Sequence, residues 1–286
     1  MTVCIAAMYQ RDDGHYGIWA ISDRRLTDEE SLIATEPEMD KSFPVNKRCM
    51  LLGAGDNLDD RDLWIAARIA AVSADLAGGM SMRKIVETYR DAYIRARVRL
   101  AETTILEPHG LTLDTWTLRQ GTMNQAIALD IARRLEERIL DVDTLIFGFN
   151  PPEPTGIGTG TLAKRPHIYR VGPFGRVTNY DTPGMATIGR GGDVSDAEMS
   201  LAGYVPNWGR AAVLRLVYTP KRKAEAVESV GVESDLFEVT EDARNKRNEL
   251  LPPLGSCYSE TIRQLQKAWR RCDAKVGALL ATKGAM

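Results

Sequence analysis

The sequence predicts an α+β fold in which two packed β-sheets are covered by helices on both sides. Three features indicate this fold: apolar strand segments near the N-terminus, helical segments in the middle of the chain, and a second group of strands followed by more helices. With 286 residues, 44% of them hydrophobic, the chain can bury the core of one large domain, alone or with appendages.

Four strands are expected near the N-terminus. Residues 3–7 form an apolar run typical of a buried strand. The Asp-Asp-Gly sequence at 12–14 predicts a turn, from which a second strand at 17–27 returns and carries Asp-Arg-Arg near its end. This hairpin brings the end of the second strand close to the start of the first. Strands at 40–45 and 50–56 follow, and the last runs into glycines that allow a backbone amide to approach a ligand.

Three helical segments are expected between these strands and the next group. The first, at 60–76, is rich in alanine, and small side chains permit close helix packing. Ser81 can cap the second helix, and the third covers 123–140 with a charged outer face. The apolar stripes of the second and third helices contain Ile85, Tyr89, Tyr93, Ala96 and Leu100, and Ile127, Ile131 and Leu135.

The strand pattern returns in the second half of the chain. Strands are expected at 143–149 and 236–239, and residues 167–177 read as a strand, a turn glycine and another strand. Residues 185–192 run from a strand into glycines. A helix is expected to begin directly afterwards, because Asp193, Ser195 and Asp196 are residues typical of a helix N-terminus.

Composition excludes several classes of protein. A formal charge of −2 gives no bias toward nucleic acids, and neither a bilayer-spanning stretch nor a signal peptide is expected. Cys4, Cys49, Cys257 and Cys272 lack metal-site spacing, which is typical of reduced cysteines in a cytoplasmic protein. His15, His109 and His167 share no spacing. We therefore expect no metal site and no cofactor.

The second residue, Thr2, is the most informative candidate for chemistry. Its small side chain permits an aminopeptidase to remove Met1, which would leave hydroxyl and free α-amine on one residue. An α-amine titrates near ~7.7–8.0, so its neutral form can accept the proton of the hydroxyl as that hydroxyl attacks a carbonyl. Position alone is a weak indication, because many proteins carry a threonine there.

Three further segments stand where such a nucleophile would need them, and together they resemble the proteasome β-subunit and HslV group of N-terminal nucleophile hydrolases. That family has threonine at the mature terminus, Asp-x-Arg after the second strand, lysine after the third and then a glycine pair. The resemblance implies that Thr2 is nucleophile and base, Asp23 orients Lys41, Lys41 lowers the proton affinity of the threonine centre, and the Gly55 amide forms the oxyanion hole.

The resemblance extends to accessory positions, some of which depart from the family. It implies that Gly53 forms the floor of the pocket for the residue before the cleaved bond, and that Ser229, in the family's second serine-glycine element, is a further catalytic residue. Arg190 stands where the family usually has a supporting serine. Ala226 replaces an aspartate, with Glu225 and Glu228 as flanking candidates.

Each candidate also has a structural interpretation. Asp23 could end a solvated hairpin, Lys41 could be a surface lysine, and Gly53 and Gly55 could serve a tight turn. At the level of function, the expected activity is a threonine-type peptidase that forms an ester on Thr2. An amidase acting on a small molecule, or a non-catalytic ring or scaffold subunit, remains an alternative.

The resemblance also implies the organisation of the chain and its partners. A four-layer αββα domain is expected over residues 1–239, with insertions near 102–120 and 151–166, and a helical extension over 240–286. Proteasome-like subunits form closed rings, so the expected partners are further copies of this chain and a peptide or unfolded protein substrate. An ATPase is a possible further partner that the sequence does not identify. Neither nucleic acid nor membrane is expected as a partner.

Overall fold

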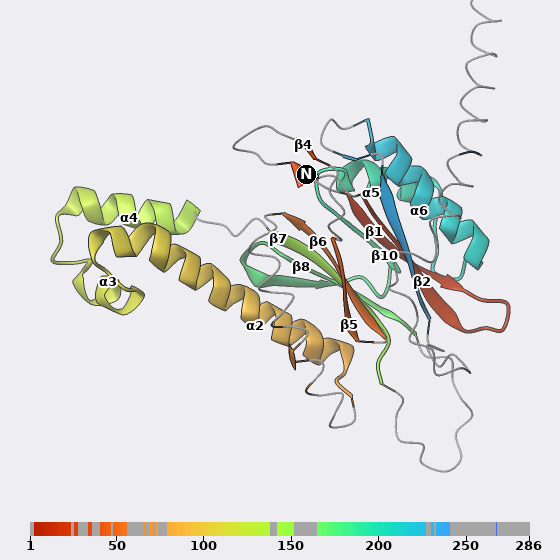
Figure 1. Cartoon of the computed structure of the whole chain (residues 1–286), viewed down its shortest axis with the longest axis horizontal. Helices are drawn as coiled ribbons and strands as arrows, with labels where there is room; N and C mark the ends of the chain where they lie inside the picture. The colour runs from red at the N-terminus through yellow and green to blue at the C-terminus, as the bar shows by residue number, and fades with distance from the viewer. Residues whose placement is uncertain are drawn as a thin grey trace, which may run out of the picture. The chain divides into compact units, whose positions relative to one another are not determined.

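The computed structural model describes residues 3–23, 26–27, 34–35, 41–46, 48–55, 66, 69–70, 73, 79–137, 142–151, 165–226, 230–231, 233–240 and 267. The chain divides into two compact units. Unit 1 contains Met1–Lys41, Ala163–Arg165 and Pro183–Met286, and unit 2 contains Ser42–Leu162 and Pro166–Thr182. Each unit has its own antiparallel sheet and its own helices (Figure 1). The predicted α+β class with two antiparallel sheets is therefore confirmed.

Unit 1 is built on a sheet with the strand order β10-β1-β2-β11. Its strands are β1 (Cys4–Gln10), β2 (Tyr16–Asp23), β10 (Met185–Ile188) and β11 (Ser234–Thr240). The predicted hairpin is present: β1 pairs with β2 from Cys4↔Ser22 to Gln10↔Tyr16, and Gly14 in the turn has a positive φ of 81°. Two further short strands, β3 (Leu26–Thr27) and β4 (Ala34–Thr35), pair with each other.

Two helices pack on one face of this sheet, α5 (Gly192–Leu201) and α6 (Arg210–Ala224) (Figure 1). The sheet contributes alternate residues of β1 to the core, as the two-residue period of a strand requires. They pack with residues of β2 and both helices, namely Val3, Ile5, Ala7, Tyr9, Trp19, Ile21, Met199, Val213 and Val217. The expected helix after residue 192 is confirmed, whereas α6 was not identified from the sequence.

Unit 2 is built on a sheet with the order β5-β6-β7-β8-β9. Its strands are β5 (Ser42–Asn46), β6 (Cys49–Gly55), β7 (Val142–Gly148), β8 (His167–Gly172) and β9 (Arg176–Asn179). Helix α2 (Met82–Ala101) packs on it, with Ile85, Tyr89 and Tyr93 buried. The Ser81 hydroxyl accepts a hydrogen bond from the Lys84 amide, so the expected cap is confirmed.

The far end of α2 continues into a helical segment that covers the insertion expected near 102–120. It contains a π-helix (Glu102–Leu106), a 3-10 turn (Glu107–His109), α3 (Leu113–Arg119) and α4 (Gln125–Glu137). A small core of its own holds it together, formed by Ile105, Leu106, Leu111, Trp116 and Ile131. In the expected stripe of α4, Ile131 is buried but Ile127 is 45% exposed.

Several expectations fall partly or wholly outside the described residues. Of the helix expected at 60–76, the described residues Ala66, Ile69, Ala70 and Ser73 are helical. The insertion at 151–166 is described only at its ends, and the extension at 240–286 only at Thr240 and Lys267. Among the described helices, none is long and apolar enough to cross a membrane. Cys4 and Cys49 are buried and not in disulfides.

Gly148 provides a test of how β6 and β7 pack. Its φ is +154°, and a Cβ placed there would lie 1.9 Å from the Arg48 carbonyl oxygen, which accepts a hydrogen bond from the Phe149 amide. Gly148→Ala should therefore lower the free energy of unfolding by about 2–4 kcal/mol. Gly121→Ala is the matched control, since a Cβ there meets nothing within 4 Å. Equal denaturation midpoints for the two variants would contradict this packing.

Candidate active site

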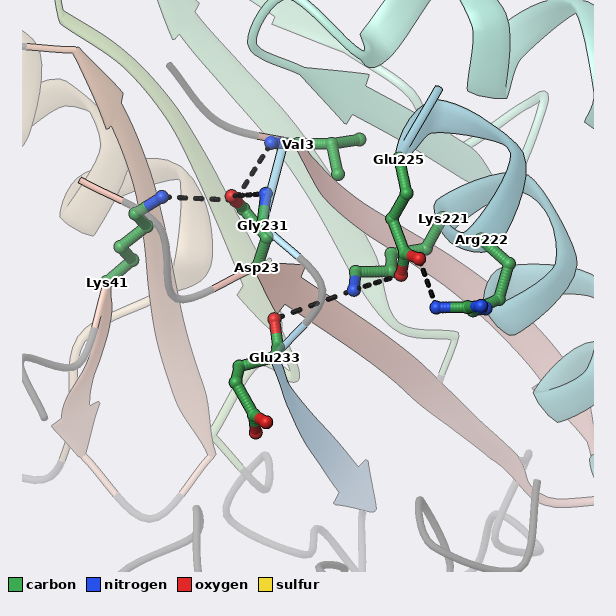
Figure 2. Close-up of polar contacts among 8 residues, drawn as sticks. All are labelled: Val3, Asp23, Lys41, Lys221, Arg222, Glu225, Gly231 and Glu233. Atoms are coloured by element: carbon green, nitrogen blue, oxygen red, sulfur yellow. Dashed lines mark hydrogen bonds and ion pairs between the residues drawn. The ribbon is translucent and has the colours of Figure 1, made fainter. Parts of the chain in front are cut away.

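The Asp23 side chain is the centre of the candidate site. It is the last residue of β2 and is fully buried. Its Oδ1 atom accepts hydrogen bonds from the Val3 amide at 3.0 Å and from the Lys41 ammonium at 3.0 Å. Its Oδ2 atom accepts one from the Gly231 amide at 2.9 Å. Figure 2 shows these donors converging on one carboxylate.

Strand pairing explains why these groups meet. The β1–β2 hairpin places the end of β2 beside the start of β1, and the Asp23 amide donates in return to the Val3 carbonyl at 3.2 Å. On its other edge β2 pairs with β11, with Asp23 opposite Ser234, so the segment that precedes β11 brings Gly231 to the same carboxylate. The expected proximity of the strand ends is thus confirmed within unit 1.

Lys41 is 4% exposed and Asp23 is 0% exposed, so both members of the ion pair are buried. The alternative interpretations, a solvated hairpin end and a surface lysine, are therefore wrong. A charge is buried in a protein at high cost unless it is paired and hydrogen-bonded. Here the carboxylate has both an opposite charge and two backbone donors.

A second buried cation lies near this pair on α6. Lys221 is fully buried, and its ammonium donates to the Glu225 carboxylate at 2.6 Å and to the Glu233 carbonyl at 3.5 Å (Figure 2). Glu225 also pairs with Arg222. Burial lowers the pKa of Lys221 below its ordinary value, although the carboxylates of Glu225 and Asp23 act in the opposite direction.

Sequence reasoning missed Lys221, although a signal for it exists. Val213 and Val217 lie on the buried stripe of α6, and Lys221 occupies the next position of that stripe at helical spacing. A lysine inside an apolar stripe is unusual, because lysine is almost never fully buried unless it is paired. The amides of Val3 and Gly231 could not be identified in this way, since any residue type supplies a backbone N–H.

Gly191, the residue directly before α5, lies close to the start of β1. A Cβ on Gly191 would be 2.9 Å from the Val3 Cβ, 3.0 Å from the Ala224 Cβ and 3.1 Å from Val230 Cγ2. Only a residue without a side chain fits there. The start of β1, the end of α6, the entry to α5 and the segment at 230–231 therefore pack against one another around Val3.

The two departures from the family pattern are visible beside this junction. Arg190 is exposed, and the hydroxyls nearby belong to Thr187, which donates to the Gly192 carbonyl at 3.1 Å, and to Ser195, which donates to the Gly191 carbonyl at 3.0 Å. Ala226 is exposed after the end of α6. Of its flanking acidic candidates, Glu225 contacts Lys221 and Arg222, and Glu228 lies outside the described residues.

The other predicted site residues are not brought into this cluster by the contacts of unit 1. Thr2 and Ser229 lie outside the described residues. Gly53 and Gly55 belong to β6 in unit 2, where Gly53 is buried and Gly55 is exposed. Gly55 has a φ of +131°, a conformation that favours glycine.

His167 makes two side-chain contacts within unit 2. Its Nδ1 lies 2.7 Å from an Asp181 oxygen and its Nε2 lies 2.8 Å from the Asn150 side-chain nitrogen. Burial alone would raise the pKa of Asp181, but hydrogen bonds from His167, Ile168 and Asn179 outweigh it and lower that pKa. Within the described part of the chain, no group of three or more His, Cys, Asp or Glu residues is arranged to hold a metal ion.

No protein-family model matches the sequence, and no curated protein is significantly similar to it. The resemblance to N-terminal nucleophile hydrolases therefore depends on the residues and contacts described above.

The buried pair predicts a stability effect that a surface lysine would not have. Lys41→Met leaves the Asp23 carboxylate buried without its counter-charge, so the free energy of unfolding should fall by about 3–5 kcal/mol. Lys84→Met is the matched control: the Lys84 side chain is 63% exposed and lies 3.9 Å from Glu87, and its loss should change stability by less than about 0.5 kcal/mol. Chemical denaturation measures both.

Adding Asp23→Asn to Lys41→Met should recover part of this loss, because the double variant buries no unpaired charge. If Lys41→Met and Lys84→Met unfold at the same denaturant concentration, the Asp23–Lys41 pair is not buried in solution.

Proposed function

We propose that this chain is a threonine-type N-terminal nucleophile hydrolase that cleaves peptide bonds through an ester on Thr2. One observation carries the proposal: a single buried carboxylate, Asp23, holds both the Lys41 ammonium and the amide of Val3. Val3 is bonded directly to Thr2 in the sequence. The contact therefore fixes the backbone next to the proposed nucleophile and the proposed activating cation through the same side chain.

In the proposed reaction, the Thr2 hydroxyl gives its proton to the free α-amine of the same residue and attacks the substrate carbonyl carbon. The Lys41 cation favours the deprotonated hydroxyl, and Asp23 orients Lys41 through their hydrogen bond. The proton passes to the leaving amine as the peptide C–N bond breaks and the ester forms. Water then attacks the ester, with the α-amine again as base, and releases the acid product and the free hydroxyl.

The Gly55 amide is the proposed donor to the oxyanion. A preset backbone donor of this kind typically contributes about 100- to 1,000-fold in rate. Its φ of +131° supports the role, because it marks a backbone conformation that a side chain would strain. Ser229 and Gly53 are proposed as a supporting hydroxyl and as the floor of a deep pocket that accepts a large side chain before the cleaved bond.

We also infer the four-layer αββα form of the fold. In β1, Ile5 and Ala7 face α5 and α6, so Cys4 and Ala6 lie on the opposite face of the sheet. A sheet that is apolar on both faces needs a covering layer on each. In an αββα fold each sheet has a covering layer on both of its faces.

The proposed setting is a homo-oligomeric cytoplasmic ring that admits peptides or unfolded chains, with an ATPase as a possible partner. Closed symmetric assembly is the usual outcome for a soluble homo-oligomer. An amidase for a small molecule would use the same groups, whereas a non-catalytic subunit would keep the Asp23–Lys41 pair only for stability. The experiments below distinguish these functions.

Thr2→Ala should reduce cleavage of a fluorogenic peptide panel by more than about 1,000-fold, because it removes the attacking oxygen. Thr2→Ser retains a hydroxyl and is the control. A threonine-directed electrophile should add its mass to the wild-type chain but not to Thr2→Ala. Unchanged turnover in Thr2→Ala would remove the mechanism; labelling without peptide cleavage would indicate the amidase, and neither labelling nor cleavage would indicate the scaffold subunit.

Activity should also require removal of Met1. With Met1 attached, the Thr2 nitrogen is an amide and cannot accept the proton of the hydroxyl. The rate of the processed protein should rise with pH through roughly one unit either side of ~7.7, where an α-amine loses its proton. Intact-mass measurement on active protein tests this, and full peptidase activity from chains that still carry Met1 would rule out the N-terminal nucleophile mechanism.

A further inference from the structure

Lys221 connects α6 to the segment that holds Asp23. Its ammonium is fixed by Glu225 one helical turn later, at 2.6 Å, and reaches the Glu233 carbonyl at 3.5 Å. Glu233 stands immediately before β11 and two residues after Gly231, whose amide donates to Asp23 Oδ2 at 2.9 Å. Figure 2 shows this route from the helix to the carboxylate.

We propose that Lys221 is a positioning residue: by holding the Glu233 carbonyl it fixes the backbone that presents the Gly231 amide to Asp23, and so fixes the orientation of the carboxylate toward Lys41. The part of this inference that concerns reaction rate rests on the proposed function, whereas the part that concerns backbone order does not.

Stability of the fold alone does not explain this lysine. Its pKa is lowered by burial, which means that the charged form is less stable at this position than in water. Nor does Glu225 depend on it for charge compensation, because Arg222 also pairs with Glu225. An apolar side chain of similar length would fill the same volume without the cost of burying a cation. An apolar side chain could not, however, donate a hydrogen bond to the Glu233 carbonyl.

The surroundings of Gly231 explain why a hydrogen-bond donor is useful at the Glu233 carbonyl. Gly231 and the described residues Val230 and Glu233 beside it are in neither a helix nor a strand, and Gly231 carries no side chain that could anchor it. Val230 is buried against the junction around Val3, which fixes one side of the segment, and β11 fixes the other. The Lys221 contact lies between these two anchors and restrains the direction of the Gly231 amide.

The test is hydrogen–deuterium exchange on the full chain, compared between wild type, Lys221→Met and the control Lys223→Met. Lys223 lies on the same helix, but its side chain is 46% exposed and pairs with Glu198 at the surface. In Lys221→Met, peptides covering residues 230–235 should exchange about tenfold faster or more. Peptides from β7 in unit 2 should not change, and Lys223→Met should stay within about twofold of wild type throughout.

Two outcomes would overturn the proposal: unchanged exchange at 230–235, or equally faster exchange in every strand, since the latter would make Lys221 a general stabilising residue. If Lys221→Met does not give folded protein, Glu225→Gln answers the same question, because it removes the carboxylate charge that holds the ammonium.

The exchange measurement needs no substrate, so it remains decisive even if wild-type protein cleaves no peptide and the proposed function fails. If wild-type protein does cleave peptides, Lys221→Met should lower kcat about tenfold or more while KM stays within about twofold, because the change acts on the orientation of Asp23 and not on substrate contacts. If Lys221→Met exchanges faster at 230–235 but keeps the wild-type kcat, the order of this backbone does not affect the reaction rate. That result would overturn the positioning role.

Discussion

The burial of the Asp23 carboxylate is the constraint on which unit 1 depends. An ionised carboxylate without exposure to water is tolerated only if every part of its charge is compensated. The compensation comes from the start of β1, from Lys41 and from the segment before β11, through Val3, Lys41 and Gly231. These groups are distant in sequence, so the carboxylate can be buried only when β1, β2 and β11 are all paired in register. The contacts of Asp23 therefore form only when the sheet of unit 1 is folded.

The packing around Val3 makes this arrangement specific. Gly191 lies so close to Val3, Ala224 and Val230 that any side chain would displace one of them. The entry to α5, the end of α6 and the segment before β11 are thereby held against the first residues of β1. Close-packed interiors transmit small changes in volume, because there is no space to absorb them. A polar site at such a junction has a fixed geometry, which is what electrostatic activation of a nucleophile needs.

Local sequence patterns predicted the strands, the β1–β2 hairpin and the meeting of its ends, because alternation and turn residues act over short distances. The importance of Asp23 and Lys41 came from their order along the chain and the resemblance it supports, and burial then distinguished them from surface residues. The sequence could not identify the amide of Gly231, which comes from a segment more than 200 residues away from Asp23. Lys221 was missed for a different reason: the stripe of α6 was not traced, although it contains a visible anomaly.

The two donors that share one oxygen of Asp23 bear on the proposed role of the site. A buried ion pair that served only stability would need its carboxylate to face the lysine, and the remaining lone pairs could be satisfied by any nearby donor. Here the oxygen that faces Lys41 also accepts from the amide of Val3, the residue bonded to Thr2. Movement of the chain start away from Lys41 would break that hydrogen bond and leave a buried oxygen with one donor fewer, at a cost of about 1–3 kcal/mol. The carboxylate therefore ties the position of the lysine to the position of the chain start, an arrangement that the proposed mechanism based on Thr2 needs.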